Sequence, residues 1–212
     1  MELVELFLHS DLTGYERGWA LLEKGSLLEC VGKWPEVLSL QEEVLKSYAS
    51  SDRTGLLSAY SLYKKSTVLS KMGQHRVARE LVKEALGRLQ EADCEPFDRA
   101  LIEQRMHIRL GRYLARSGDG VEADRVTSMT IDRLKKLLID SKGYEEEEAV
   151  HVELYMAYVE LSQMKLSRSE CHPTDDLDAE KLRSALHHAK KVHGDSEGFE
   201  AAGKNLYKSV KI

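Results

Sequence analysis

The chain has 212 residues, of which 42% are hydrophobic and 32% are charged, with only 3 Pro and 14 Gly. This composition excludes collagen-like and disordered chains, and the net charge of −5 excludes a global basic footprint for nucleic acid. No apolar stretch is long enough to span a membrane, and the acidic N-terminus lacks the pattern of a signal peptide. The 3 Cys are an odd number at wide spacing, which favours free thiols and a cytoplasmic or nuclear location.

Helix-forming residues dominate the sequence, and the prolines stand where helices are expected to begin. Leu, Ala, Glu, Lys and Arg are common, whereas runs of β-branched and aromatic residues are scarce, which favours helix over strand. Proline is tolerated in the first turn of a helix. Pro35 and Pro96 each open an apolar pattern of helical period, and Pro173 stands a few residues before another.

Three glycines mark helix ends at a regular spacing. Gly32, Gly73 and Gly118 each follow an apolar run of helical period, as a C-terminal cap would, and each is followed within a few residues by a further helical run. Each glycine is therefore expected at the tip of a helical hairpin. The first two are 41 residues apart and the last two are 45 apart, a period typical of stacked helical pairs.

Four such pairs account for most of the chain. We expect them at about 13–50, 54–92, 96–140 and 144–194, followed by a C-terminal cap at 195–212. In the fourth pair the expected helices cover about 145–166 and 177–193, with a longer and more polar connection. The whole chain, 1–212, is expected to form one helical repeat domain.

The pairs share residues at fixed distances from the hairpin glycine. Seven residues before it stands a small residue, and four before it stands a leucine; these are Gly25, Ser66 and Gly111, and Leu28, Leu69 and Leu114. Five and twelve residues after it stand further small or β-branched residues, namely Val37, Ala78 and Ala123, and Val44, Ala85 and Thr130. A small residue in each helix lets the two helices of a pair approach closely, so the packing gain offsets the helix penalty of glycine, roughly 1 kcal/mol.

This pattern resembles the tetratricopeptide repeat (TPR), in a variant with a period longer than the usual 34 residues. The likeness covers about residues 15–140 and extends weakly over 145–195. It implies an all-α fold, a right-handed α-α superhelix of about four helical hairpins. Other helical-hairpin arrays, such as 14-3-3-like and HEAT-like ones, remain open alternatives.

Motifs that would indicate catalysis or metal binding are missing from the sequence. It contains no phosphate-binding loop, no nucleophile elbow and no zinc-protease motif, and its Cys and His spacings are not those of a zinc site. We therefore expect no catalytic residues, no metal and no cofactor.

The resemblance implies that the first helices of successive pairs line a concave groove that binds peptides. The residues expected there are Tyr60, Tyr63, Lys71, Arg105, Ile108, Arg112 and Arg116. The three arginines share one helix face, and a guanidinium is well suited to carboxylate, which predicts an acidic segment or a C-terminal carboxylate as ligand. The alternative is that they form a solvated face and pair with Glu145 to Glu148 or with Glu153 of the next helix.

The function expected from these observations is a non-enzymatic protein–protein interaction module, a scaffold or adaptor that binds a peptide or partner protein. The alternatives are a peptide-responsive regulatory sensor and a structural subunit of a larger assembly. Some members of the family bind the C-terminal carboxylate of chaperones and use asparagine at positions where this chain has Ser26, Thr67 and Arg112. Binding of chaperone C-termini is therefore not expected here. Neither nucleic acid nor membrane is expected as a partner, and a homo-oligomer remains open.

Overall fold

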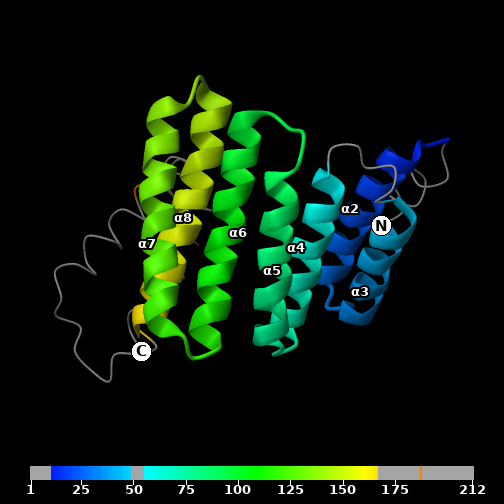
Figure 1. The fold of residues 1–212 in the computed structure, drawn as a ribbon, viewed down its shortest axis with the longest axis horizontal. Helices are drawn as coiled ribbons and strands as arrows, with labels where there is room; N and C mark the ends of the chain where they lie inside the picture. Colours follow the sequence, from blue (N-terminus) through cyan, green and yellow to red (C-terminus); the bar gives the residue numbers. More distant parts are fainter. Residues whose placement is uncertain (1–10, 49–54, 167–186, 188–212) are drawn as a thin grey trace. The chain divides into compact units, whose positions relative to one another are not determined.

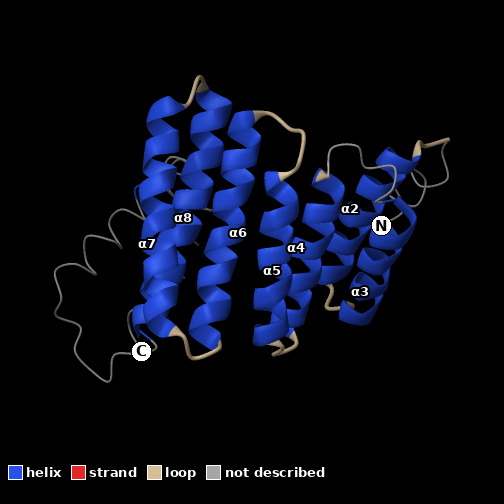
Figure 2. Ribbon diagram, in the orientation of Figure 1, coloured by secondary structure: helices blue, strands red, loops and turns tan. Residues whose placement is uncertain are grey.

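A computed structural model describes residues 11–48, 55–166 and 187, and within these ranges the chain is helical without strands (Figures 1 and 2). The elements are α2 (Gly14–Cys30), α3 (Trp34–Glu43), the π-helical segment η1 (Val44–Tyr48), α4 (Leu56–Lys71), α5 (His75–Gln90), α6 (Pro96–Arg116), α7 (Gly120–Asp140) and α8 (Tyr144–Leu166). The all-α class is thereby confirmed for this part of the chain. No helix in these ranges has both the length and the apolar character that a membrane crossing needs.

The helices fall where the glycine and proline pattern predicts them. α2 and α3, α4 and α5, and α6 and α7 form the first three pairs, and α8 is the expected first helix of the fourth. Pro35 lies in the first turn of α3, and Pro96 is the first residue of α6. The expected helix at 177–193, apart from His187, and the cap at 195–212 lie outside the described residues.

The chain divides into two compact units, residues 1–99 and residues 100–212. The first unit holds α2 to α5, and the second holds α7, α8 and all but the first turn of α6. In the first unit α2 contacts α3 and α4, α3 contacts α4, and α4 contacts α5; in the second unit α7 contacts α8.

Each of the three hairpins turns with the same backbone geometry. Gly32, Gly73 and Gly118 have φ of 74°, 81° and 90°, a left-handed conformation that glycine adopts without a steric penalty. In every case the amide that follows the glycine donates to the carbonyl five residues back: Lys33 to Leu28, Gln74 to Leu69, and Asp119 to Leu114, at 2.9–3.0 Å. This is the Schellman motif, and it confirms the three glycines as helix C-terminal caps.

The helices of the first pair cross closely at Gly25, which is buried in α2. A Cβ added there would lie 2.8 Å from Nε2 of Gln41 and 3.7 Å from Cγ1 of Val37, both on α3. Gln41 is fully buried, and both its main-chain oxygen and its Oε1 accept from the Ser61 hydroxyl of α4, at 3.0 and 3.1 Å. A glycine at this crossing therefore makes room for a buried glutamine that joins the first pair to α4.

The third pair repeats this arrangement with different residues. A Cβ on Gly111 would overlap Oγ1 of Thr127 and lie 3.6 Å from the main-chain oxygen of Ala123. Gln41 and Thr127 are both nine residues beyond their hairpin glycine, and Val82, the equivalent residue of the second pair, is also fully buried. The residue nine positions after the hairpin glycine thus lies opposite the small residue at the helix crossing, and the sequence pattern did not identify it.

The positions that recur at fixed distances from the hairpin glycine are buried in all three pairs. The leucines four residues before the glycine and the residues five and twelve after it are all buried, none of them more than 8% exposed. In the first unit, Leu21, Leu22, Val44 and Leu57 form one core cluster, and Leu28, Val37 and Val68 form another. The alignment of the pairs on their hairpin glycines is therefore an alignment of their buried positions.

The close crossing of α6 and α7 predicts that Gly111→Ala destabilises the chain. The added methyl group meets Thr127, so we expect the free energy of unfolding to fall by about 1–3 kcal/mol, measured by urea denaturation. Gly87→Ala is the matched control, because Gly87 lies within α5 with nothing within 4 Å of the added Cβ. There the better helix propensity of alanine should stabilise by about 0.5–1 kcal/mol.

A compensating substitution checks that the cause is the crossing itself. Thr127→Ala removes the hydroxyl that the new methyl group meets, so the double variant should be more stable than the sum of the two single effects. Strict additivity of the two substitutions would show that the two helices do not touch at this point.

Candidate functional site

In the first unit, the first helices of two successive pairs lie side by side and run in the same direction. The rings of Trp19 on α2 and Tyr60 on α4 are 5.2 Å apart, and Lys71 Nζ lies 2.7 Å from Oε1 of Glu29. The first contact joins residue 19 to residue 60, and the second joins residue 29 to residue 71. Residue numbers therefore rise in the same direction along both helices, so α2 and α4 are parallel. Residues on these two helices therefore form one continuous wall.

Aromatic rings occupy the N-terminal half of this wall. Tyr15 contacts Trp19, Trp19 contacts Tyr60, and Tyr60 contacts Tyr63, each edge to face, with ring centroids 5.2–6.4 Å apart. Tyr63 is only 6% exposed, whereas Tyr60 is half-buried. Of the two tyrosines predicted to bind a partner, Tyr60 thus presents part of its ring at the surface and Tyr63 belongs mainly to the core.

In the second unit, ion pairs join α6 to α8, and the longest of them brings Arg109 Nη1 to 4.0 Å from Oε1 of Glu160. Arg105 Nε donates to Oε1 of Glu153 at 2.7 Å, and Arg112 Nε donates to Oε2 of Glu160 at 2.8 Å. The partners are 48 residues apart in both pairs, so the two helices run parallel. The first helices of the third and fourth pairs are therefore arranged like those of the first and second.

The carboxylates of these pairs are buried although their arginines are not. Glu153 and Glu160 are 4% and 2% exposed, while the side chains of Arg105 and Arg112 are 37% and 27% exposed. A carboxylate can be removed from water only when a cation and hydrogen bonds compensate it. The guanidinium groups thus hold α8 against α6, and they present only their outer edges to solvent.

The other predicted residues of the third pair differ in exposure. Ile108 lies between the two arginines on the same face of α6, the face that α8 covers, and it is 2% exposed. Arg116, one turn beyond Arg112, is exposed. Of the partners proposed for the arginines from sequence, Glu153 does pair with Arg105. The acidic run instead lies at the start of α8, where Glu145, Glu146 and Glu147 occupy the first turn.

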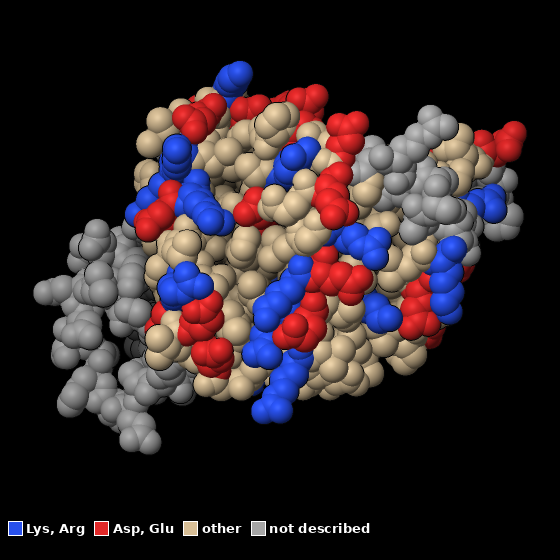
Figure 3. Space-filling view, in the orientation of Figure 1, with Lys and Arg blue, Asp and Glu red and all other residues tan. Residues whose placement is uncertain are grey.

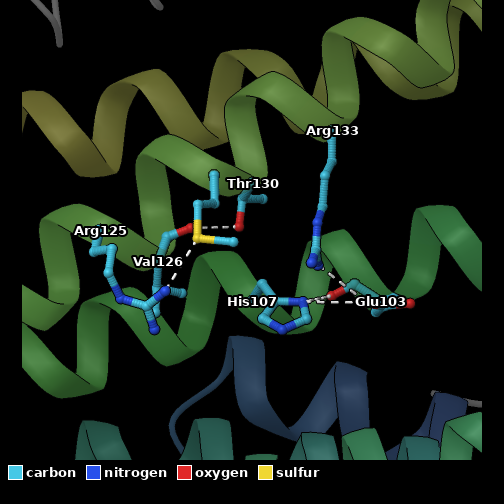
Figure 4. A network of polar contacts seen from close by, with 7 residues as sticks. Glu103, His107, Arg125, Val126, Thr130 and Arg133 are labelled. Atoms are coloured by element: carbon cyan, nitrogen blue, oxygen red, sulfur yellow. Dashed lines mark hydrogen bonds and ion pairs between the residues drawn. The ribbon is translucent and has the colours of Figure 1, made fainter.

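A second feature of this unit, which the sequence did not indicate, is a cleft between α6 and α7. It has a volume of about 310 Å³ and is lined by Ala100, Glu103, Gln104, Arg133, Lys136, Leu137 and Asp140. Figure 4 shows Arg133 of α7 reaching towards Glu103 of α6, and Nη1 donates to Oε1 at 3.3 Å. The cleft therefore brings two cations, two carboxylates and an amide together at one end of the third pair.

His107 lies one turn along α6 from this cleft. Its Nδ1 donates to the main-chain oxygen of Glu103 at 2.9 Å, as Figure 4 shows. Burial lowers the pKa of His107 below its ordinary value of about 6.5, and Arg133 adds to this effect, while the Glu103 carboxylate opposes it. The imidazole is consequently neutral at neutral pH.

Charges of both signs are interspersed on the face shown in Figure 3. Some charged residues form exposed pairs within one helix, such as Arg125 with Glu122 on α7. Exposed pairs of this kind contribute little to stability. They provide a reference for the buried pairs between α6 and α8.

The buried ion pairs predict an asymmetric result of substitution. Arg105→Met leaves the buried Glu153 carboxylate without this partner, so we expect a loss of about 2–4 kcal/mol in the free energy of unfolding. Substituting Met for both residues should restore most of this loss. Arg125→Met, which breaks the exposed pair, should cost less than about 0.5 kcal/mol. Equal losses of unfolding free energy in Arg105→Met and Arg125→Met would contradict a stabilising role for the Arg105–Glu153 pair.

The lowered pKa of His107 predicts a dependence of stability on pH. The unfolded chain takes up the proton more readily than the folded chain, so stability should fall as the pH drops below about 6.5. His107→Gln removes this contribution. Urea denaturation at about pH 7.5 and about pH 5 should therefore show a smaller loss in the variant than in the parent chain. The same loss in both would mean that His107 does not contribute.

Comparison with known proteins does not assign the chain to a family. No known protein-family model matches the sequence, and no curated protein matches it. The likeness to tetratricopeptide repeats therefore rests on the residues and hairpins of this chain, and membership of that family stays a prediction.

Proposed function

We propose that this protein is a non-enzymatic interaction module of the tetratricopeptide type, a scaffold or adaptor that binds a peptide or partner protein. In this proposal its helical pairs continue into a right-handed superhelix, and the partner lies along the first helices of the pairs. An acidic segment is the favoured ligand.

The observation that carries this proposal is the common register of the three complete hairpins. The same left-handed glycine, the same main-chain hydrogen bonds and the same buried positions recur in each of them. Units built alike stack alike, because each presents the same surface to the next. This regularity is what a helical-pair array requires.

The parallel first helices supply the surface that such a partner would contact. In the first unit this wall carries Tyr60, which is half-buried, and Lys71, whose side chain is 45% exposed. In the second unit the first helices of the third and fourth pairs present parts of Arg105 and Arg112 and the exposed Arg116. An aromatic ring provides an apolar anchor, and cations favour an acidic ligand.

Peptide binding by single variants of the full chain tests the proposal. An array of acidic peptides that differ in their apolar residues is screened with the parent chain, and the strongest binder is labelled for fluorescence anisotropy. Tyr60→Ala, Lys71→Ala and Arg116→Ala are then measured one at a time. Arg105 and Arg112 are left intact, because their removal would unpair buried carboxylates and confound binding with folding.

We expect at least one of the three variants to weaken binding about fivefold to tenfold, and the affinity to fall as salt is added. Arg125→Ala on α7 is the control, since it removes an exposed cation outside the proposed wall. If no peptide binds the parent chain, or if all three variants bind as the control does, the proposal is wrong.

A further inference from the structure

The α2–α4 seam, the line along which the first helices of the first two pairs meet, is fixed by a contact towards each end. The rings of Trp19 and Tyr60 lie 5.2 Å apart in its N-terminal half, and Lys71 Nζ lies 2.7 Å from Oε1 of Glu29 at its C-terminal end. Tyr60 and Lys71 therefore both face α2. A residue of α4 at helical spacing from both of them faces the same seam.

Lys64 is such a residue. It lies four residues after Tyr60 and seven residues before Lys71, so the three side chains share one stripe of α4. Lys64 is half-buried on this stripe. Its place on the seam thus follows from the measured contacts on both sides of it.

The ammonium group of Lys64 has no counter-ion among the described residues. Two other lysines of α4 are paired, since Lys65 Nζ lies 3.2 Å from Oε1 of Glu42 and Lys71 contacts Glu29. Lys64 forms no ion pair and no side-chain hydrogen bond within the described ranges. Partial removal of a cation from water is unfavourable unless an anion compensates it. An acidic group placed on the seam would supply that compensation.

Aromatic rings form the part of the seam one helical turn from Lys64. Trp19 and Tyr60 are both half-buried and touch edge to face, and rings of this kind are effective anchors for an apolar side chain. Four residues advance α4 by about 6 Å. Residues i and i+2 of an extended peptide are about 6.6 Å apart and point to the same side. The seam therefore fits an aromatic and an acidic residue separated by one residue.

We propose that the α2–α4 seam binds an extended segment in which one residue separates an aromatic from an acidic side chain. The carboxylate pairs with Lys64, and the aromatic ring packs against Trp19 and Tyr60. The assignment rests on the proposed peptide-binding function and specifies its ligand. Lys64, which was not among the binding residues predicted from the sequence, receives the charge.

Short peptides separate the two elements of this recognition. Acetyl-Phe-Ala-Glu-amide and acetyl-Glu-Ala-Phe-amide carry both side chains and cover the two chain directions. In the order that binds better, a second peptide replaces Glu by Gln, which removes the charge, and a third replaces Phe by Ala, which removes the ring. Each peptide is titrated into the full 212-residue chain, and amide chemical shifts are followed by NMR.

We expect the better complete peptide to bind with a dissociation constant of roughly a millimolar and to shift amides near Tyr60 and Lys64. The glutamine and alanine peptides should each bind at least about fivefold more weakly, because each lacks one of the two contacts. Equal binding of the complete peptide and of either replacement would overturn the proposal.

Variants of Lys64 test the residue itself. Lys64→Met keeps an apolar stem and removes the charge, so it should weaken binding of the complete peptide about fivefold or more and bind the glutamine peptide as the parent chain does. Lys64→Arg keeps the charge and should restore most of the affinity. Lys33→Met is the control, because Lys33 is an exposed lysine at the first hairpin, outside the seam. If Lys64→Met binds the complete peptide as tightly as Lys33→Met, the proposal is wrong.

Urea denaturation of Lys64→Met supplies a second readout. Because the ammonium group has no counter-ion in the described structure, its removal should leave the urea midpoint equal to or above that of the parent chain. Loss of binding without loss of stability distinguishes a ligand contact from a structural one. A clearly lower midpoint would show that the charge of Lys64 stabilises the fold, and the proposal would fail.

Failure here and failure of the proposed function give different results. If array peptides bind the parent chain and Lys64→Met equally well, the seam assignment fails and peptide binding along the first helices stands. If neither the array peptides nor the short peptides bind the parent chain, the interaction-module function fails, and the seam assignment fails with it.

Discussion

Close approach of paired helices is the constraint on which the described structure depends. At Gly25 and Gly111 the facing helix comes so near that a Cβ would meet Gln41 or Thr127. Once the helices touch at this point, the residues five and twelve positions after each turn are buried along the rest of the contact. In the first and third pairs the missing side chain therefore allows the close spacing of the two helices.

Polar interactions help to connect one pair to the next. In the first unit the hydroxyl of Ser61 reaches the buried amide of Gln41, and in the second unit arginines of α6 hold the buried carboxylates of α8. These contacts are polar and directional, and in the first unit they lie beside apolar contacts of Leu57 and Val68 of α4 with the first pair. The polar groups also govern what the first helices can offer a partner, because a guanidinium that neutralises a buried carboxylate is only in part available to a ligand.

Much of the local structure could be predicted from the sequence, because it depends on residues close together in the chain. A glycine after an apolar helical run predicts a cap, and a small residue seven positions earlier predicts a close crossing. Partners far apart in the sequence were harder to predict. Periodicity placed Arg105, Ile108 and Arg112 on one face, but whether that face is open or covered depends on where α8 lies. The position of Glu160 seven residues after Glu153, matching the spacing of the arginines, is a signal that could have identified the second pair.

The ion pairs of Arg105 with Glu153 and of Arg112 with Glu160 also oppose sliding of α8 along α6. Seven residues advance a helix by about 10.5 Å, and two tethers at that separation leave a single axial setting in which both are satisfied. A shift along the axis would lengthen both of these contacts at once. The ion pairs therefore favour one axial position of α8 along α6.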